Sequence, residues 1–559
     1  MGLIEKYLDR IEFESYEDFK SNYKVNVPEN FNFAYDIIDE WARIEPDKLA
    51  LIRCDDAGNE KRYTFTDLKR ESDRTANFLS GKGIKKQDVV MILLKQRPEA
   101  WITILALCKI GAAVIPATYQ LTPKDIVYRC NSAKIKMIVA VNSNDIVPHL
   151  KAAMPDCKYL ESVAICDDDV PEGFIDYRNE VAASESVFVR PSGKDAVSNT
   201  DTMLIYFSSG TTGMPKMVRH DFTYPLGHIT TAKYWQRVED GGLHLTTSDS
   251  GWAKFAWGKI YGQWICGAVI VGYDEDKFVP QNLLEKINKY KLTTFCATPT
   301  IYRFLIKEDM SGCDFSSIKR CATAGEPLNP EVYDQFYKLT GKHICEGFGQ
   351  SESSVLAANF GWFEEKPGSM GKPSPLYDID IVDMETGKSC EDGVVGTIVV
   401  KNAEKNRPVG LFSEYMYDDA ANERAFVNGV YNTGDTAWRD CDGYYWFVGR
   451  NDDIIKCSGY RIGPFEVESA LLTHPSVLEC AVTAAPDSVR GQVVKATVVL
   501  AKGFTPSDEL KKELQNHVKV TTAPYKYPRI LEFTEEIPKT LGGKIKRGDI
   551  RKDDESKSK

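Results

Sequence analysis

Close groupings of cysteine and histidine are missing from this sequence. Its 14 cysteines form no C-x-x-C pair, and its 7 histidines form no H-E-x-x-H motif or Cys/His cluster. These absences argue against a structural zinc site and against a disulfide framework. Scattered free cysteines fit a reducing compartment, so we expect a cytoplasmic protein.

Long apolar runs and an excess of positive charge are also missing. The longest apolar run, 101–115, is interrupted by Lys109 and is too short to cross a bilayer. The first residues show neither the apolar segment of a signal peptide nor a myristoylation pattern. A formal net charge of −11 disfavours binding to nucleic acid or anionic membranes. We therefore expect no nucleic-acid partner and no membrane insertion, while an oligomer remains possible.

A chain of 559 residues is too long for one hydrophobic core, so we expect at least two domains. In the first half, helical spacing alternates with strand-like apolar runs, which predicts parallel sheets covered by helices. We expect a helix that follows 63–66, with Thr66 as its N-cap, and further helices over 32–45 and 99–111. The expected strands are 50–52, 89–94, 112–115, 136–141 and 204–207.

The pattern of apolar and polar residues changes in the second half of the sequence. Short alternating runs at 377–382 and 396–400 predict a small β subdomain. A polar break after Arg450 suggests a domain boundary, which divides the chain into 1–451 and 452–559. The second part has a slight excess of Lys and Arg, whereas the first part is acidic. Such a basic part suits a polyanionic ligand, although the excess is small enough to arise by chance.

A strand followed by a loop rich in Ser, Thr and Gly stands out at 204–216, LIYFSSGTTGMPK. Gly210 and Gly213 permit backbone angles that other residues avoid. Hydroxyls and free N–H groups of such a loop can surround a phosphate, and Lys216 adds positive charge at its rim. A Walker A loop is excluded because the glycines are too close together and no Ser or Thr follows the lysine. The alternative is an ordinary polar surface loop.

Aromatic side chains surround one lysine at 252–257. Trp252, Lys254 and Trp257 could line a pocket for an apolar carboxylic acid. The alternative is a core helix whose lysine extends to solvent. Cys296, in the next predicted strand, is a further candidate for the wall of this pocket.

Glycine-rich and acidic strings follow at 322–327, 346–352 and 431–435, where ligands could meet the carboxyl ends of parallel strands. Glu352 is a candidate Mg²⁺ ligand because Mg²⁺ prefers hard oxygen atoms; the alternative is a solvated surface glutamate. Asp435 follows a glycine that we expect to form a turn, and its carboxylate could accept hydrogen bonds from ribose hydroxyls. Lys544, on a Gly-rich turn, could reach into a site on another domain, unless it is simply part of a basic terminal loop.

These strings, in this order, resemble the motifs of the AMP-forming adenylating superfamily over roughly residues 30–550. That superfamily includes acyl-coenzyme A synthetases, luciferases and the adenylation domains of peptide synthetases. The strings EGFGQSE (346–352), CSGYRIGPFEVE (457–468) and APYKYPR (523–529) most resemble medium-chain acyl-coenzyme A synthetases. The resemblance implies an α/β fold, with a large N-terminal domain of parallel-rich sheets and a β subdomain. A small, mobile α+β lid would follow a hinge at Asp452.

The resemblance also implies a two-step reaction with ATP, Mg²⁺ and coenzyme A. A carboxylic acid would form acyl-AMP with release of pyrophosphate, and coenzyme A would then take the acyl group. Lys544, Arg461 and Glu352 would be catalytic, with Glu352 on the metal. The implied ATP-binding residues are Ser208, Ser209, Gly210, Thr211, Thr212, Gly213, Met214, Pro215, Lys216, Gly325, Glu326, Pro327, Glu346, Gly347, Phe348, Gly349, Gln350, Ser351, Asp435, Arg450 and Lys544. The implied coenzyme A-binding residues are Ser458, Gly459, Tyr460, Arg490, Lys519, Tyr527, Pro528 and Arg529.

Position 349 bears on the choice of acid. Acetate-specific relatives carry Trp where this chain has Gly349, so a deeper pocket for a longer or branched acid is expected. Gly349 and Ser351 would complete the pocket walls formed by Trp252, Lys254, Trp257 and Cys296. The rival interpretations are an aryl- or amino-acid adenylating ligase that loads a carrier protein, a luciferase-like enzyme and a non-enzymatic nucleotide sensor. No carrier domain follows Lys559, which counts against the first of these.

Overall fold

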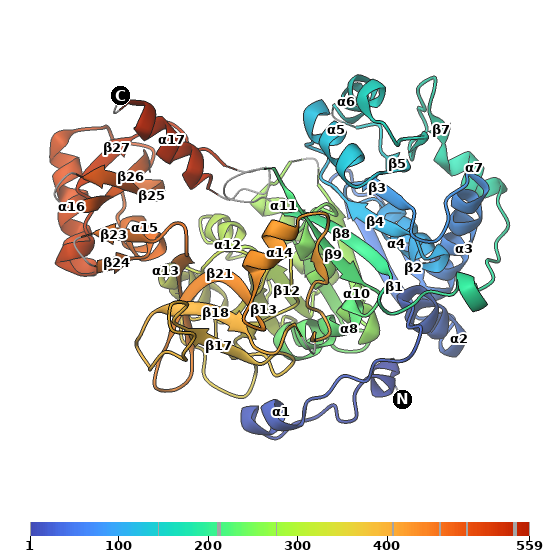
Figure 1. Cartoon of the computed structure of the whole chain (residues 1–559), viewed down its shortest axis with the longest axis horizontal. Helices are drawn as coiled ribbons and strands as arrows, with labels where there is room; N and C mark the ends of the chain where they lie inside the picture. The colour runs from blue at the N-terminus through green and yellow to red at the C-terminus, as the bar shows by residue number, and fades with distance from the viewer. Residues whose placement is uncertain are drawn as a thin grey trace.

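Two large sheets form the body of the chain in this computed structural model (Figure 1). The structure describes residues 2–143, 145–208, 214–275, 277–404, 407–457, 460–487, 490–539 and 545–557. The first sheet has nine strands, and its neighbours from β14 through β13, β12, β10 and β11 to β1 are parallel. In spatial order the strands are β16 (Lys372–Pro373), β15 (Ala357–Ala358), β14 (Ile344–Phe348), β13 (Arg320–Thr323), β12 (Thr294–Ala297), β10 (Leu243–Thr246), β11 (Val269–Asp274), β1 (Leu49–Asp55) and β2 (Glu60–Thr64).

The second sheet has eight strands, which are parallel from β8 to β7 and antiparallel at the β9 edge. Its strands are β19 (Glu414–Tyr415), β9 (Lys216–Asp221), β8 (Thr202–Ser208), β4 (Ala113–Pro116), β3 (Val89–Leu93), β5 (Met137–Ala140), β6 (Ser162–Ile165) and β7 (Ile175–Asp176). The residues of β3, β4 and β5 are all buried, as their continuous apolar sequence predicts for central parallel strands.

Helices connect and cover these strands. In the body they are α1 (Tyr16–Asn22), α2 (Glu40–Ile44), α3 (Phe65–Gly81), α4 (Pro98–Ile110), α5 (Pro123–Ser132), α6 (Ile146–Ala153), α7 (Tyr177–Ala183), α8 (Tyr224–Ile229), α9 (Ala253–Gly258), α10 (Tyr261–Ile265), α11 (Pro280–Tyr290), α12 (Pro299–Leu305), α13 (Pro330–Thr340) and α14 (Asp419–Ala425). Two π-helical segments, Ala34–Asp39 and Thr230–Trp235, extend α2 and α8.

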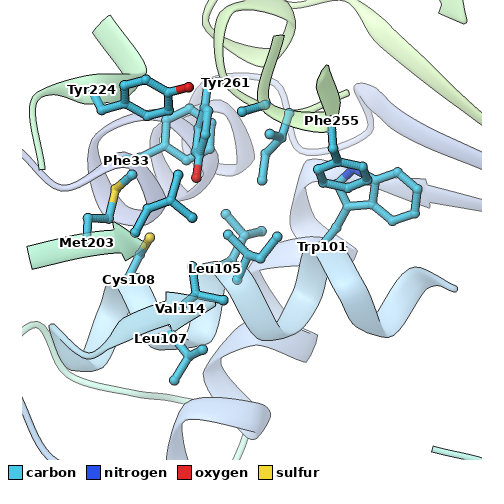
Figure 2. Packing of buried hydrophobic residues seen from close by; sticks show 14 of the residues in the cluster. Phe33, Trp101, Leu105, Leu107, Cys108, Val114, Met203, Tyr224, Phe255 and Tyr261 are labelled. Carbon is cyan, nitrogen blue, oxygen red and sulfur yellow. The ribbon is translucent and has the colours of Figure 1, made fainter. Parts of the chain in front are cut away.

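Large aromatic side chains pack between the two sheets (Figure 2). Trp101 of α4 lies against Phe255 of α9, with ring centroids 5.0 Å apart. Its indole also reaches the first sheet, because a Cβ on Gly272 of β11 would lie 2.8 Å from that ring. Tyr224 of α8 and Tyr261 of α10 lie 5.8 Å apart in the same core. Burial of each such ring contributes about 2 kcal/mol, so α4 and α8–α10 hold the two sheets together.

A small antiparallel sheet forms the predicted β subdomain. It contains β17 (Ile379–Val382), β18 (Gly396–Val400), β21 (Val430–Arg439), β20 (Phe426–Val427) and β22 (Tyr445–Arg450). Except for β19, the strands of the two large sheets precede it in the chain, and it carries the segment Tyr431–Asp435. The subdomain that the sequence predicts is therefore present.

The C-terminal part has its own sheet and hydrophobic core, at the left of Figure 1. Its elements are β23 (Ile455–Cys457), β24 (Tyr460–Ile462), α15 (Pro464–Leu472), β25 (Val477–Asp487), β26 (Gly491–Leu500), α16 (Asp508–Thr521), β27 (Ile530–Phe533) and α17 (Arg547–Lys557). One face of its sheet packs against α15 and α16 through Val467, Leu471 and Leu514. The α+β architecture expected for this part is confirmed.

Most of the predicted elements are confirmed, but the N-cap of α3 is not Thr66. The cap is Thr64, whose hydroxyl accepts from the N–H of Asp67 at 3.1 Å while the Asp67 carboxylate accepts from the N–H of Thr64 at 3.0 Å. This reciprocal capping box satisfies two unpaired donors of the first turn, which Thr66 could not do. The hydroxyl of Thr66 instead donates to the carbonyl of Pro46. Within the described residues, no helix is both long and apolar enough to cross a membrane.

Candidate active site

The predicted nucleotide loop closes a hairpin instead of leading into a helix. β8 and β9 pair antiparallel, with Ser208 opposite Lys216. A Walker A loop connects a strand to a helix, so this topology agrees with the exclusion of that motif. Met214 is exposed, and the carbonyl of Pro215 accepts from the hydroxyl of Tyr128 at 2.9 Å. The loop residues that lie outside the described part, and whose role stays a prediction, are Ser209, Gly210, Thr211, Thr212 and Gly213.

Glu352 lies close to Lys216 although the two are far apart in the sequence. It is not a simple solvated surface residue, because Tyr415 donates to its Oε1 at 2.9 Å and Phe412 N–H donates to its carbonyl at 2.7 Å. Burial raises the pKa of Glu352, while the hydrogen bond from Tyr415 and the charge of Arg450 oppose that rise. Lys216 Nζ lies 4.7 Å from the ring centroid of Tyr415. A carboxylate and an ammonium group thus flank one tyrosine beside the hairpin.

Asp435 and Arg450 form a second pair. They face each other across β21 and β22, with Asp435 Oδ1 3.3 Å from Arg450 Nη1. The expectation that Asp435 follows a turn is wrong. Gly434, at φ +70°, lies within the ten-residue strand β21, where its N–H donates to the Asn432 side chain at 2.8 Å. The strand therefore deviates locally and does not reverse.

Gln350 and Asp452 lie beside this pair. Arg450 Nε lies 3.9 Å from Asp452 Oδ1, and it is buried with no hydrogen-bond partner among the described residues. Gln350 Nε2 donates to Asp435 Oδ2 at 2.5 Å and to the carbonyl of Thr433 at 2.8 Å. An acceptor and a fixed donor side by side suit the hydroxyls of a ribose.

The segments 322–327 and 346–351 lie next to each other, because β13 and β14 are parallel neighbours with Thr323 opposite Glu346. Gly325 has φ +101°, which favours glycine. Glu326 accepts from the hydroxyl of Thr300 at 2.9 Å, and Pro327 is half-buried beside it. The two segments follow neighbouring parallel strands, so they lie at the same edge of the sheet. Ligands commonly bind at this edge in parallel sheets.

Glu346 is a deeply buried member of this group. Its side chain is 4% exposed and accepts from the N–H of Leu328 at 3.3 Å. Burial raises the pKa of Glu346 to about 8, and that hydrogen bond opposes the rise. Its side chain therefore supports the 325–328 loop through Leu328, and the raised pKa favours its protonated form.

Three other members of 346–351 contact three different elements. A Cβ on Gly347 would lie 2.5 Å from the indole of Trp235, so only glycine fits there. Phe348 is half-buried, 6.2 Å from Phe447 between ring centroids. The carbonyl of Ser351 accepts from His220 Nε2 at 2.7 Å, and burial lowers the pKa of that histidine to about 3. A neutral His220 thus fixes the loop through one hydrogen bond.

Gly349 is pressed against Trp257. A Cβ at position 349 would lie 2.3 Å from Trp257 Cη2 and 2.7 Å from the carbonyl oxygen of Ser354. The position has no positive φ, so close packing and not backbone conformation requires glycine here. The indole of Trp257 thus occupies the space beside Gly349 that the sequence predicts to be open. Cys296 is buried as well.

Lys254 reaches a neighbouring loop, and its place in the wall of an acyl pocket stays a prediction. Trp252 is the N-cap of α9, and Lys254 follows in the first turn of this helix. Lys254 Nζ donates to the carbonyl of Ala324 at 2.8 Å. The ammonium group therefore lies at the loop that follows β13, between the aromatic wall and the predicted adenine segment.

The predicted coenzyme A residues fall into separate groups on the C-terminal part. Tyr527 is flanked by Lys519 and Arg529, at 4.2 Å and 4.9 Å from its ring centroid, and Arg529 donates to its hydroxyl at 2.7 Å. The carbonyl of Pro528 accepts from Gln515 at 2.9 Å. α16, which carries Lys519, is well separated from β8 and β9 in Figure 1.

Two other predicted residues of this part lie outside that group. Tyr460 stacks on Tyr525, with centroids 4.2 Å apart, and the N–H of Arg490 donates to Asp487 at 2.8 Å. Asp452 lies in the turn between β22 and β23. The predicted residues whose placement or side chain lies outside the described part are Ser458, Gly459, Arg461 and Lys544.

Sequence reasoning missed the residues that fix the others in place. Tyr415, Tyr431 and His220 each hydrogen-bond to a predicted site residue between 350 and 352. No local pattern marks them, because β19, β21 and β9 come beside this loop only through the tertiary fold. Among the described residues, no three His, Cys, Asp or Glu side chains gather as a metal site.

Sequence comparisons match nearly the whole chain to known proteins. The family described as AMP-binding enzyme matches residues 38–415, and the AMP-binding enzyme C-terminal domain matches residues 466–544. The chain is 42% identical over 550 residues to the acyl-coenzyme A synthetase ACSM3, mitochondrial, of Mus musculus, which covers 97% of this chain and 93% of that protein. It is 40% identical over 549 residues to ACSM4, mitochondrial, of Homo sapiens, with 96% and 93% covered.

Solved structures share the same architecture. The anthranilate CoA ligase AuaEII, solved in complex with anthranoyl-AMP, superposes with a TM-score of 0.86 at 27% identity, over 95% of this chain and 99% of the other. An acyl-CoA synthetase of Brucella canis superposes with a TM-score of 0.71 at 31% identity, over 95% of both chains. The similarity therefore extends across the nucleotide hairpin, the Asp435–Arg450 pair and the C-terminal part.

Proposed function

The chain belongs to the AMP-binding enzyme family, and from this premise we propose that it is an acyl-coenzyme A synthetase for medium-chain or branched carboxylic acids. The observation that carries this proposal is the 42% identity to an acyl-coenzyme A synthetase over 97% of the chain. The candidate site lies inside the shared region, and its chemistry suits MgATP. ATP and coenzyme A are then substrates, together with a small carboxylic acid.

The first half-reaction makes the acid reactive. A carboxylate oxygen attacks the α-phosphorus of ATP, the bond to the β-phosphate breaks, and pyrophosphate leaves. Because the reactants carry like charges, catalysis depends on positioning and on charge neutralisation. We assign 208–216 to the β- and γ-phosphates, and 325–327 with 346–351 to the adenine and α-phosphate. Asp435 and Arg450 hold the ribose.

The residues at Glu352 fit a magnesium ion. Glu352 offers hard carboxylate oxygens, and only its Oε1 is used by Tyr415. Mg²⁺ commonly takes one or two carboxylates and completes its shell with phosphate oxygens and water, so a cage of several acidic residues is not required. When bound, the ion neutralises phosphate charge. Glu352 is the residue that would hold it.

The second half-reaction uses the C-terminal part as a mobile lid. We propose that residues 452–559 rotate about Asp452, so that Lys544 and Arg461 serve adenylation and 458–460 serve thioester formation. The thiol sulfur of coenzyme A attacks the acyl carbon, AMP leaves, and the thiol proton is released. Lys519, Tyr527 and Arg529 form a basic aromatic cluster that suits the phosphates and adenine of coenzyme A. Arg490 adds a further positive charge on this part.

The compartment of this chain is a separate matter. The relatives are named as mitochondrial proteins, whereas the sequence predicts a cytoplasmic one. Both compartments keep thiols reduced, and all 14 cysteines are free.

The rival function is aryl-acid adenylation, which the fold match to an anthranilate CoA ligase favours. Pyrophosphate release from straight-chain, branched and aryl acids, each with and without coenzyme A, separates the two functions. The proposal expects the highest kcat/KM for a straight or branched acid of medium length. A preference for aryl acids would favour the rival.

A further inference from the structure

Two buried tyrosines reach the same short loop from different strands. Tyr415 of β19 donates to Glu352 Oε1 at 2.9 Å, and Tyr431 of β21 donates to Gln350 Oε1 at 2.6 Å. The two tyrosines are 7% and 1% exposed. Each therefore uses its hydroxyl proton on a polar side chain of 350–352.

The tyrosines are held in place by one phenylalanine. The ring of Phe412 lies 4.9 Å from that of Tyr415 and 5.2 Å from that of Tyr431, measured between centroids. The N–H of Phe412 donates to the carbonyl of Glu352 at 2.7 Å. Three aromatic residues and the loop 350–352 thus form one packed unit, in which neither hydroxyl can turn away without loss of ring packing.

Tyr415 also contacts the nucleotide hairpin. The ammonium of Lys216 lies 4.7 Å from its ring centroid, and Tyr415 pairs with Val218 where β19 joins β9. One face of this side chain attracts Lys216, while its hydroxyl orients Glu352. Both groups are proposed to act at the metal and the terminal phosphates, so Tyr415 fixes their separation.

Tyr431 acts on the opposite end of the nucleotide. Its hydroxyl donates to Gln350 Oε1. The Gln350 amide nitrogen therefore points the other way and donates to Asp435 Oδ2 at 2.5 Å and to the carbonyl of Thr433 at 2.8 Å. Asp435 in turn faces Arg450 at 3.3 Å. Without Tyr431, the Gln350 amide could rotate and present its oxygen to the Asp435 carboxylate.

We infer that Tyr415 and Tyr431 are positioning residues for MgATP, with Tyr415 serving the metal and phosphate end and Tyr431 serving the ribose end. This inference rests on the proposed function. It predicts that loss of each hydroxyl affects a different part of the nucleotide. A purely structural role would instead lower thermal stability and weaken all ligands alike.

Tyr415→Phe and Tyr431→Phe separate these possibilities, because each removes one hydroxyl and keeps the ring. Tyr417→Phe is the matched control, since Tyr417 is 67% exposed and lies two residues from Tyr415. Calorimetric titration of the full chain with AMP, with ATP plus Mg²⁺ and with ATP plus EDTA gives binding constants that do not depend on turnover. The melting temperature of each variant is measured in the same buffers.

A hydrogen bond to a charged group changes an equilibrium constant by at most roughly 10- to 100-fold, which limits the effect of the lost Tyr415–Glu352 bond on binding. We expect Tyr415→Phe to raise the Kd for MgATP by up to that factor and to leave the Kd for AMP within about twofold. Tyr431→Phe should raise the Kd for AMP and for ATP in both buffers. Equal weakening of all three ligands by Tyr415→Phe, or binding unchanged from the Tyr417→Phe control, would overturn the inference. Wild-type chain that binds MgATP but forms no acyl-coenzyme A would instead contradict the proposed function and leave this test intact.

Discussion

A single methyl group at position 349 should change which acids the enzyme accepts. In Gly349→Ala the new Cβ would lie 2.3 Å from Trp257 Cη2, whereas ordinary contacts between such atoms are 3.4–4 Å. The indole must therefore move by about 1 Å or more. Trp235 and His228 pack around it, at 5.9 Å and 6.2 Å between ring centroids, so it has little room to retreat into the core. We expect it to shift into the space that we propose for the acyl chain of the acid.

The size of the effect follows from the room that the acid loses. Each buried methylene contributes about 0.8 kcal/mol, and a shift of about 1 Å removes room for about one methylene. That corresponds to roughly a fourfold drop in kcat/KM for a six-carbon acid relative to a three-carbon acid in Gly349→Ala. Gly349→Trp should act in the same direction, and loss of room for three methylenes would cost about 2.4 kcal/mol, or roughly a fiftyfold drop.

Trp257→Ala provides the opposite perturbation. Removal of the indole leaves a cavity beside Gly349, so longer acids should gain relative to short ones. The assay is kcat/KM for straight-chain acids from acetate to octanoate, in wild type, Gly349→Ala, Trp257→Ala and the double variant. In the double variant the methyl group meets no indole, and the chain-length preference should return to that of Trp257→Ala. The methyl group still lies 2.7 Å from the Ser354 carbonyl, so the recovery in absolute rate should be partial.

One outcome would refute this reasoning. If Gly349→Ala lowers kcat/KM equally for all acids, and Trp257→Ala leaves their ranking unchanged, the contact is only a packing requirement of the loop. Melting temperatures of the four proteins show whether a general loss of rate comes from unfolding.

Three further predictions concern the lid and the pH dependence of stability. Lys544→Ala should slow adenylation by about a hundredfold or more, equivalent to about 3 kcal/mol, and spare thioester formation from supplied acyl-AMP; equal losses in both half-reactions would contradict the role assigned to Lys544. Arg490→Glu should raise the KM for coenzyme A and leave ATP–pyrophosphate exchange unchanged, and a disturbed exchange would count against its placement. Burial raises the pKa of Glu346 to about 8 from 4.5, so the folded state keeps a proton that the unfolded state has released, and stability should fall as pH rises through that window. Glu346→Gln should lack this loss of stability when its melting temperature is measured from pH 5 to 9. An identical dependence of melting temperature on pH in wild type and Glu346→Gln would contradict this prediction.

The central strands of the fold could be predicted because their signal is local. Continuous apolar runs such as 89–93 and 137–140 are buried on both faces, and the structure contains them within a residue or two of the expected bounds. The N-cap of α3 was the exception. Thr64 and Thr66 have the same side chain, and the reciprocal bond with Asp67 decides between them.

Single residues of the candidate site could be predicted from the sequence, but the contacts that hold them in place could not. Glu352 and Asp435 stand out because of their neighbours in the sequence, whereas Tyr415 and Tyr431 have no such mark. Their role depends on two contacts between distant parts of the sequence. β19 pairs with β9, and Tyr431 of β21 donates to Gln350 in the loop after β14. The contact between Gly349 and Trp257 is of the same kind. The sequence alone therefore suggested an empty space where the structure has an indole.

The central claim is that this chain converts a carboxylic acid into an acyl-coenzyme A through acyl-AMP. The most direct measurement follows pyrophosphate release and identifies the acyl product by mass spectrometry, with hexanoate and MgATP, in the presence and absence of coenzyme A. The account predicts acid-dependent pyrophosphate release that continues over many turnovers only with coenzyme A, together with hexanoyl-coenzyme A as product. Acid-dependent pyrophosphate release with no thioester on coenzyme A would contradict it.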